Sequence, residues 1–339
     1  MSAEPPTDHQ MPSETSVGVG DAPREIVIIK PSSLGDVVHT LPAVAMVRRA
    51  YPDARIRWLI NPEWAPLLEE NPHIDDVVIF PRGEFRGLRG VARLLPWVQS
   101  MRCEVQADLV LDFQGLLRSA LLARLFRRAG GRIVGLSDAR EGARFAYDDT
   151  AKVAGKEHAV DRYLALVEAL GIATGGPLEW PLPAGIRPGS FSSEEPFILL
   201  HPFSRGAGKS MAVDDVGAFC RALAPRRVVI AGRSDVTLPP ITNATDLLNR
   251  TSLLELIWLI RRAEFVVSVD SGPMHIAAAL TSRLLSIHTW SDPTKVGPYR
   301  DDAWIWKDGQ IARRDKAAVG KPAADVNAIA HFIADLLSR

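Results

Sequence analysis

A strand, a short turn and the start of a helix follow one another in Glu25-Ile-Val-Ile-Ile-Lys30-Pro-Ser-Ser-Leu-Gly35-Asp36. The run up to Lys30 is β-branched and of strand length, and a helical pattern continues from Asp36 to about Ala50. A strand that leads through a short loop into a helix is the repeating unit of a parallel α/β sheet. The segment therefore predicts a doubly wound sheet.

The same alternation continues on both sides of one break. Further strands are predicted at 55–60, 77–80, 107–112, 197–200, 227–230, 265–269 and 284–287. The segment between Ile172 and Pro196 is rich in Pro and Gly, which is typical of a linker. We expect a tail at 1–23, two similar α/β domains at 24–175 and 197–322, a linker at 176–196 and a C-terminal helix within 323–339.

Composition excludes several classes of protein. The 339 residues are 47% hydrophobic and 24% charged, which suits a globular protein with two cores. Lys+Arg and Asp+Glu both total 40, and a zero net charge argues against a general nucleic-acid binder. Two cysteines, Cys103 and Cys220, exclude a disulfide framework and fit a reducing compartment.

No apolar run reaches the ~18 residues of a membrane span, and the first 23 residues lack a signal-peptide pattern. We expect a cytoplasmic protein with a disordered tail.

Asp36 is the first candidate for chemistry. It lies in the first helical turn after a predicted strand, and open α/β sheets bind ligands at the carboxyl ends of their strands. The helix dipole favours an ionised carboxylate there, which can act as a general base. An acidic residue at this position is also a common helix cap. Both interpretations remain open on spacing alone.

A second candidate is the Asp270-Ser-Gly-Pro-Met-His275 segment, which follows the predicted strand 265–269. Pro273 suits the first position of a helix. The N–H groups near Ser271 and Gly272 can hold a diphosphate, and His275 can add a donor. A capped helix with a packed histidine is the structural alternative.

A third candidate is the loop His201-Pro-Phe-Ser-Arg-Gly-Ala-Gly-Lys209. It does not fit the Walker A spacing, but its lysine can neutralise a phosphate as a point charge. Taken alone, it is more typical of a flexible surface loop.

The sequence has no G-x-G-x-x-G after the first strand, which disfavours a nicotinamide site. It also has no Asp-x-Asp pair, so no carboxylate-held metal is expected.

Arginine is concentrated in one part of the first half. From Arg82 to Arg144 there are twelve Arg, no Lys and six Asp or Glu. Within this region, the basic and amphipathic segment 85–98 can lie on an anionic membrane surface. A solvated helix face is the commoner explanation for such a pattern.

Several motifs together resemble bacterial lipopolysaccharide heptosyltransferases of glycosyltransferase family 9, and the type I enzymes more than type II. The resemblance extends over nearly the whole chain from Arg24. Its motifs are Lys30-Pro-Ser-Ser-Leu-Gly-Asp-Val-Val-His-Thr-Leu-Pro-Ala43, Asp112-Phe-Gln-Gly-Leu-Leu-Arg-Ser119, Ala139-Arg-Glu141, His158-Ala-Val-Asp-Arg162 and Val269-Asp-Ser-Gly-Pro-Met-His275.

The resemblance implies a GT-B fold, in which two Rossmann-like domains face each other across a cleft. It implies inverting, metal-independent transfer of L-glycero-D-manno-heptose from ADP-heptose, without a cofactor, to the Kdo sugar of a lipid A precursor. The implied enzyme is a cytoplasmic, monomeric protein, peripheral on the anionic inner face of the membrane, with no nucleic-acid partner. The implied catalytic residues are Asp36 and Lys209. The implied donor-binding residues are Ser33, Leu34, Gly35, Ser204, Thr251, Asp270, Ser271, Gly272 and His275. The implied acceptor-binding residues are Arg118, Arg140, His158 and Arg162.

Two features depart from the type I pattern. Met211 stands where these enzymes usually have Trp, and the loop before Lys209 is one residue longer. A different nucleotide-sugar or acceptor therefore remains an alternative.

Two other classes of protein share the architecture. One is a nucleotide-binding oxidoreductase, which the missing glycine fingerprint disfavours. The other is a non-catalytic membrane-associated protein, which the presence of Asp36, Lys209 and His275 disfavours.

Overall fold

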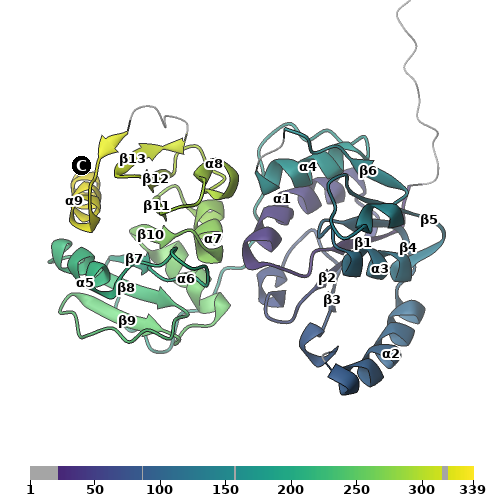
Figure 1. The fold of residues 1–339 in the computed structure, drawn as a ribbon, viewed down its shortest axis with the longest axis horizontal. Helices are drawn as coiled ribbons and strands as arrows, with labels where there is room; N and C mark the ends of the chain where they lie inside the picture. Colours follow the sequence, from purple (N-terminus) through teal and green to yellow (C-terminus); the bar gives the residue numbers. More distant parts are fainter. Residues whose placement is uncertain (1–21, 86, 156–157, 315–319) are drawn as a thin grey trace, which may run out of the picture.

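The computed structural model describes residues 22–85, 87–155, 158–314 and 320–339. The predicted tail lies outside these residues, apart from its last two positions. The described chain forms two α/β halves, each built around one sheet (Figure 1). Among these residues, no helix is long and apolar enough to cross a membrane.

The first half contains a parallel sheet in the order β3-β2-β1-β4-β5-β6. Its strands are β1 (Glu25–Ile29), β2 (Arg55–Ile60), β3 (Asp76–Ile79), β4 (Ala107–Asp112), β5 (Arg127–Leu136) and β6 (Asp149–Ala151). Its helices are α1 (Leu34–Ala50), α2 (Gly87–Glu104), α3 (Leu117–Phe126) and α4 (Ala159–Glu168), with short 3₁₀ turns η1 (Ala65–Leu68), η2 (Arg82–Phe85) and η3 (Ala143–Ala146). Every residue of β1 after Glu25 is buried, as its unbroken apolar run requires in a sheet covered on both faces.

The second half repeats this strand order. Its sheet runs β14-β13-β12-β11-β10-β7-β8-β9, and the neighbours from β9 to β12 are all parallel. The strands are β7 (Phe197–His201), β8 (Arg227–Gly232), β9 (Ala244–Leu248), β10 (Phe265–Val269), β11 (Leu284–His288), β12 (Trp304–Lys307), β13 (Gln310–Arg313) and β14 (Lys321–Pro322). The helices are α5 (Val213–Ala222), α6 (Leu253–Arg262), α7 (Gly272–Leu280), α8 (Pro293–Val296) and α9 (Val326–Leu337).

The predicted strands are all present, with ends that shift by no more than two residues. The structure adds six strands that the sequence patterns did not predict: β5, β6, β9, β12, β13 and β14. The first half of β5 is largely exposed and contains Arg127, Gly130 and Gly131, so it lacks an apolar run. The antiparallel β12–β14 extension lies at the edge of its sheet.

Helices α1 and α7 lie on the facing sides of the two halves and pack against each other (Figure 1). Side chains of both helices, including Val38 and Ile276, belong to one continuous apolar core. Polar contacts join the halves beside it. Tyr299 donates to Asp161 at 2.5 Å, and His158 Nε2 lies 3.1 Å from the carbonyl oxygen of Gly297. The halves therefore share a packed, partly polar junction.

Candidate functional site

Asp36 and the segment Asp270–His275 lie where strand order reverses in each sheet. In the first sheet this is the β1–β4 pair, and in the second it is the β7–β10 pair. At such points the loops after neighbouring strands diverge and leave a crevice for a ligand. Asp36 follows β1 and Asp112 ends β4, whereas His201 ends β7 and Asp270 follows β10.

Asp36 is held by three neighbouring side chains. Its Oδ2 accepts from the backbone N–H and the hydroxyl of Ser33, at 3.0 and 2.7 Å. Its Oδ1 accepts from the Tyr163 hydroxyl at 3.1 Å and lies 3.9 Å from Lys30 Nζ. The side chain is still 37% exposed. Asp36 thus caps α1 through one oxygen and presents a reachable carboxylate, so both sequence interpretations fit the geometry.

Charge and hydrogen bonding keep this carboxylate ionised. Burial would raise the pKa of Asp36, but the charge of Lys30 and the bonds from Ser33 and Tyr163 outweigh it, so the pKa lies below its ordinary value. Lys30 is buried and donates to the carbonyl of Phe113 at 3.1 Å. Burial lowers the pKa of Lys30, and the negative charge of Asp36 opposes that effect. Asp36 can therefore accept a proton at neutral pH.

The N-terminal turns of α1 and α7 meet at the junction. A methyl group on Gly35 would lie 2.6 Å from Cδ2 of His275, and one on Gly272 would lie 2.5 Å from Cδ2 of Leu34. Only glycine allows such close approach. Helix N-termini carry unpaired N–H groups and a partial positive charge. Two of them side by side, at Ser33 and Ser271, favour an anionic ligand.

Lys209 and Asp270 form an ion pair on the second half. Lys209 Nζ lies 2.6 Å from Asp270 Oδ2 and 5.1 Å from the centre of the Trp290 ring. Burial would raise the pKa of Asp270, but hydrogen bonds from Lys209 and Ser291 lower it below its ordinary value. Thr289 and Trp290 also donate to the carbonyls of residues 208 and 207. The loop that carries Lys209 is therefore fixed to the end of β11.

The other predicted donor contacts lie at strand ends of the same half. Ser204 is joined to Ser210 by two hydrogen bonds, of 3.0 and 3.2 Å, which close the base of the Lys209 loop. Thr251 is buried between β9 and α6, and its carbonyl accepts from Arg233 at 3.5 Å. Ser271 Oγ lies 3.3 Å from His201 Nδ1.

Two of the predicted acceptor residues lie near Lys30, which contacts Asp36, and a third lies in the first turn of α3. Arg140 and Arg162 both lower the pKa of Lys30, after the larger effect of its burial, so both act close to the base. Arg162 forms an ion pair with Asp138 at 2.7 Å. Burial, followed by the charge of Arg82, lowers the pKa of Arg118 at the start of α3.

His158 has a different environment from these arginines. It is buried, its Nδ1 accepts from the backbone N–H of Val160, and its Nε2 contacts the carbonyl of Gly297. Both ring nitrogens are therefore engaged within the protein. An acceptor would have to displace one of these contacts, so we do not retain His158 among the proposed acceptor contacts.

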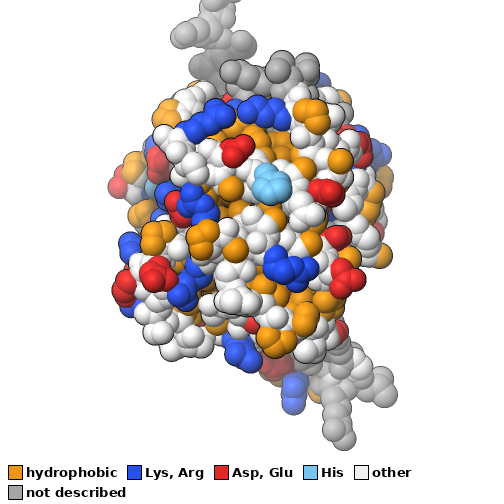
Figure 2. All heavy atoms as spheres, turned by 90° about the vertical axis from the view of Figure 1, so that its left-hand side faces the viewer, with side chains coloured by type: hydrophobic (Ala, Val, Ile, Leu, Met, Phe, Trp, Pro, Cys, Tyr) orange, Lys and Arg blue, Asp and Glu red, His pale blue; other side chains and the backbone are white. Residues whose placement is uncertain are grey.

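The basic segment 85–98 lies mostly in α2. Trp97 packs its ring against Phe80 and Phe85, with centres 5.4 and 5.6 Å apart. Part of the apolar face of α2 is thus used inside the protein. The exposed apolar side chains nearby are Leu95 on α2, Leu117 and Leu121 on α3, and Phe145 on η3. By contrast, the face of the second half in Figure 2 carries both signs of charge interspersed.

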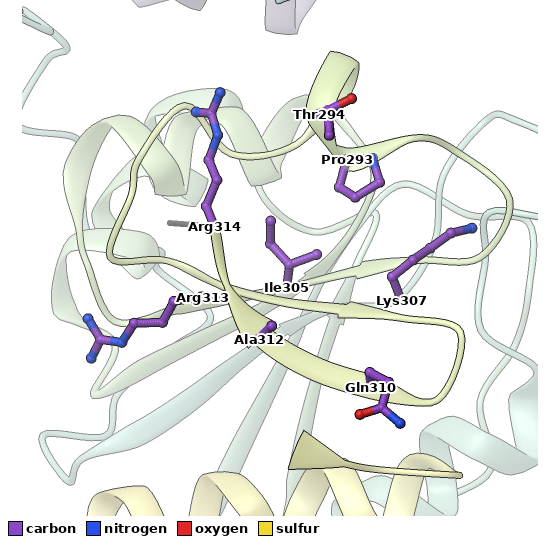
Figure 3. Close-up of a pocket in the computed structure, with 8 residues that line it drawn as sticks. All are labelled: Pro293, Thr294, Ile305, Lys307, Gln310, Ala312, Arg313 and Arg314. Atoms are coloured by element: carbon purple, nitrogen blue, oxygen red, sulfur yellow. The ribbon is translucent and has the colours of Figure 1, made fainter. Parts of the chain in front are cut away.

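Two cavities lie in the second half. The larger, of about 500 Å³, lies between α8 and the β12–β13 strands; Ile305 is central, and Lys307, Arg313 and Arg314 extend around it (Figure 3). None of the sequence-predicted site residues lines it. The smaller, of about 290 Å³, is lined by Lys209, Met211 and the start of α9.

Among the described residues, no group of three or more His, Cys, Asp or Glu is placed to hold a metal ion.

Three residues with clear roles in this geometry were not singled out from the sequence. They are Lys30 and Tyr163, which contact Asp36, and Trp290, which contacts the Lys209 loop. A lysine at the end of an otherwise apolar buried strand was an available signal for Lys30. Tyr163 lies 127 positions from Asp36, so only the tertiary fold reveals that contact.

Comparison with known proteins agrees with this architecture. The family model described as "Glycosyltransferase family 9 (heptosyltransferase)" matches residues 98–199 and 225–320, more than half of the chain. This chain belongs to glycosyltransferase family 9. It is therefore a glycosyltransferase, as the motifs predicted.

Two relatives align over most of their length. The lipopolysaccharide core heptosyltransferase OpsX of Haemophilus influenzae is 25% identical over 301 residues, covering 83% of each chain. Lipopolysaccharide heptosyltransferase 1 of Pseudomonas aeruginosa is 29% identical over 302 residues, covering 81% of each. The solved structure of E. coli heptosyltransferase WaaC superposes with a TM-score of 0.72 at 22% identity, covering 92% of this chain and 99% of that one. The predicted GT-B fold is confirmed.

Proposed function

We propose that this chain transfers L-glycero-D-manno-heptose from ADP-heptose to the Kdo sugar of a lipid A precursor, with inversion at the anomeric carbon. The observation that carries the proposal is the ionised, reachable Asp36 carboxylate at the junction where the N-termini of α1 and α7 meet. The names of the aligned relatives support a role in assembling the lipopolysaccharide core. The Gly35-Asp-Val-Val-His-Thr-Leu-Pro42 run favours the type I reaction.

The proposed reaction is a single displacement. The acceptor hydroxyl gives its proton to Asp36 while its oxygen forms a bond to the anomeric carbon. The bond between that carbon and the diphosphate oxygen breaks on the opposite side, and ADP leaves with the electron pair. General-base assistance of this kind typically contributes ~10²–10⁴-fold. A packed junction that holds both substrates adds a proximity effect.

The departing diphosphate gains negative charge, which the second half is suited to stabilise. The N-terminus of α7 offers unpaired N–H groups and its dipole, and Lys209 supplies a full positive charge. Fixed donors and charges of this kind act without reorganisation during the reaction. We infer that these groups carry out the leaving-group stabilisation without a metal ion or cofactor.

The proposed acceptor is an anionic lipid, and the charge around Asp36 suits one. Arg140 and Arg162 lie close to Lys30, and Arg118 lies in the first turn of α3. Helix α3 and η3 also carry exposed apolar side chains, with Leu121 62% and Phe145 77% exposed. We infer that this face, with its flanking arginines, rests on the inner leaflet of the cytoplasmic membrane. This assignment moves the predicted membrane contact from segment 85–98 to α3 and η3.

A direct assay tests the proposal. The purified chain is incubated with ADP-heptose and Kdo-lipid A, with UDP- and GDP-sugars as alternative donors, and the product is followed by mass spectrometry. We expect one heptose to be added when ADP-heptose is the donor and no sugar to be added from the UDP- or GDP-sugars. The NMR spectrum of the product should show an inverted anomeric configuration. Transfer only from another nucleotide-sugar would overturn the donor assignment and leave the family intact.

A further inference from the structure

Three buried histidines meet where α1, α4 and α7 come together. His39 on α1 lies between His158, at the start of α4, and His275 on α7, with ring centres 4.9 and 4.2 Å away. His39 Nε2 and His275 Nδ1 share a hydrogen bond of 2.9 Å. His39 is 6% exposed and His275 is 9% exposed. A bond between two rings across the junction links the two halves of the molecule.

Only one proton occupies a hydrogen bond between two ring nitrogens, so the pair has two neutral arrangements. In one, His39 donates through Nε2–H, and its buried Nδ1 is a bare lone pair. In the other, His275 donates, and the same buried Nδ1 of His39 carries an N–H. That nitrogen has no partner among the described residues. A buried donor without a partner is costly and rare, so the first arrangement is favoured.

This choice fixes the remaining nitrogen of His275. A neutral imidazole carries one N–H, so His275 must hold its proton on Nε2. None of the described residues hydrogen-bonds to that nitrogen, and unlike Nδ1 of His39 it is not among the fully buried side-chain atoms that lack a partner. It would lie 3.3 Å from a methyl group on Gly35, and the charges of both Asp270 and Asp36 act on the ring. His275 therefore presents an N–H donor at the junction, between the proposed base and the proposed diphosphate site.

We propose that His39 is a positioning residue that fixes His275 in the Nε2–H tautomer and aims this N–H at the diphosphate of the donor. The inference rests on the proposed function, because the donor is the anion that this N–H would contact. His39 itself touches no substrate. Its role is to keep the lone pair of His275 pointed away from an anion, which a bare nitrogen would repel.

The groups around the pair are consistent with neutral rings. Burial has the largest effect on His39, and the charges of His275, His158 and Lys30 add to it, so its pKa lies well below the ordinary value. Burial and His158 lower the pKa of His275 to about 4, although Asp270 and Asp36 oppose them. Protonation of both rings would place two N–H groups against each other across 2.9 Å.

The test compares two substitutions of His39. His39→Gln keeps an N–H donor at nearly the same distance from the backbone, whereas His39→Leu removes it and keeps the bulk. Nitrogen chemical shifts of ¹⁵N-labelled histidine report which ring nitrogen of His275 carries the proton, and calorimetry reports ADP affinity. We expect His39→Leu to lose the single tautomer and weaken ADP binding about tenfold, and His39→Gln to restore most of both. His331→Leu, at an exposed position on α9, is the matched control.

The outcomes separate this inference from the proposed function. A wild-type His275 protonated on Nδ1 would overturn the inference. Unchanged ADP affinity in a His39→Leu protein whose His275 tautomer has changed would also overturn it, because the N–H would then not serve the donor. A wild-type protein that holds the expected tautomer but neither binds ADP nor transfers heptose would contradict the proposed function instead.

Discussion

The two carboxylate oxygens of Asp36 have different neighbours. One carboxylate oxygen closes the first turn of α1 by accepting from Ser33, and the other faces Tyr163 and Lys30. A cap is common for an acidic residue in a first helical turn. A buried lysine 3.9 Å away is not needed for capping, and its charge lowers the pKa of Asp36. The local charge arrangement thus favours the base form of Asp36.

Removing the Lys30 charge should therefore change the pH dependence of the reaction. In Lys30→Met the pKa of Asp36 loses its main lowering influence and rises, while burial continues to raise it. We expect the acid limb of kcat/KM to move to higher pH, with the largest loss of activity below neutral pH. The profile is measured from pH 4.5 to 8.5 beside Lys152→Met, an exposed control. Superimposable acid limbs would argue against coupling between Lys30 and the base.

Lys209 and Asp270 form an ion pair, so their substitutions should be tested both singly and together. Lys209→Ala removes a cation from the proposed diphosphate site and leaves the buried Asp270 carboxylate facing that site. Charged hydrogen bonds are worth about 1.5–3 kcal/mol, so ADP affinity should fall by at least about tenfold. Adding Asp270→Asn should recover part of the loss, because it removes the repulsive charge. Calorimetry with ADP checks both variants, and unchanged affinity in Lys209→Ala would remove it from the donor site.

How far the sequence predicted these residues depends on how local their signals are. Asp36 and the Asp270–His275 turn lie directly after strands, where the ligand edge of an α/β sheet can be located without a structure. The contacts of Tyr163 and His39 could not be predicted, because they depend on how α4 and α7 pack against α1. His158 is a different case: the family resemblance suggested an acceptor contact, and the structure shows both ring nitrogens engaged inside the protein.

At the scale of elements, α3 and η3 carry the exposed apolar side chains and arginines on which the proposed membrane contact rests. The two elements pack together, and Arg124 on α3 donates to the carbonyl of Ala146 at 2.9 Å. The Arg144 guanidinium lies 4.8 Å from the centre of the exposed Phe145 ring. Binding to a membrane surface grows with apolar area and with attraction of basic groups to anionic lipids. This surface offers both.

A charge placed on this face should weaken membrane binding. Leu121→Glu introduces a carboxylate at a side chain that is 62% exposed, so folding should be unaffected. Each basic contact with an anionic surface is worth about 1 kcal/mol, so we expect roughly a fivefold loss of binding to vesicles containing phosphatidylglycerol, measured by sedimentation. The control is Ile186→Glu, at an exposed position in the segment of the chain that connects α4 to β7. Equal binding of wild type and Leu121→Glu would rule out this face as the membrane contact.

Secondary structure was predictable where burial is continuous and less so at sheet edges. Strands β1, β7, β10 and β11 are buried along nearly all their length, and their apolar runs located them. Strand β5 begins on the surface, and β12–β14 form an antiparallel extension whose pairing depends on neighbouring strands. For such edge strands, tertiary pairing rather than local sequence determines the structure.

At the scale of the whole molecule, two halves with the same strand order are joined by an apolar contact between α1 and α7. The alternation of strands and helices predicted both halves. It could not predict which helices face each other, because α1 is buried all round from Val37 to Val47 and no single face marks the junction. The close approach at Gly35 and Gly272 shows that the two helix N-termini lie side by side.

The buried histidines at and near this junction make stability depend on pH. Burial lowers the pKa of His201, His275 and His288 to about 4. Below about pH 6.5 the unfolded chain binds protons that the folded protein does not, so each such group costs up to about 1.4 kcal/mol per pH unit. The free energy of unfolding should therefore fall steadily from pH 6.5 to about 4. Urea titrations at intervals of one pH unit test this, and constant stability across that window would contradict it.

The proposed reaction depends above all on Asp36 removing the proton from the acceptor. Replacing it with asparagine keeps its size and most of its cap but removes the base. The decisive measurement compares single-turnover heptose transfer and ADP binding in Asp36→Asn and wild type. We expect ADP affinity to stay within about twofold and transfer to slow by ~10²–10⁴-fold. Transfer at a rate close to that of the wild type would show that Asp36 is not the base.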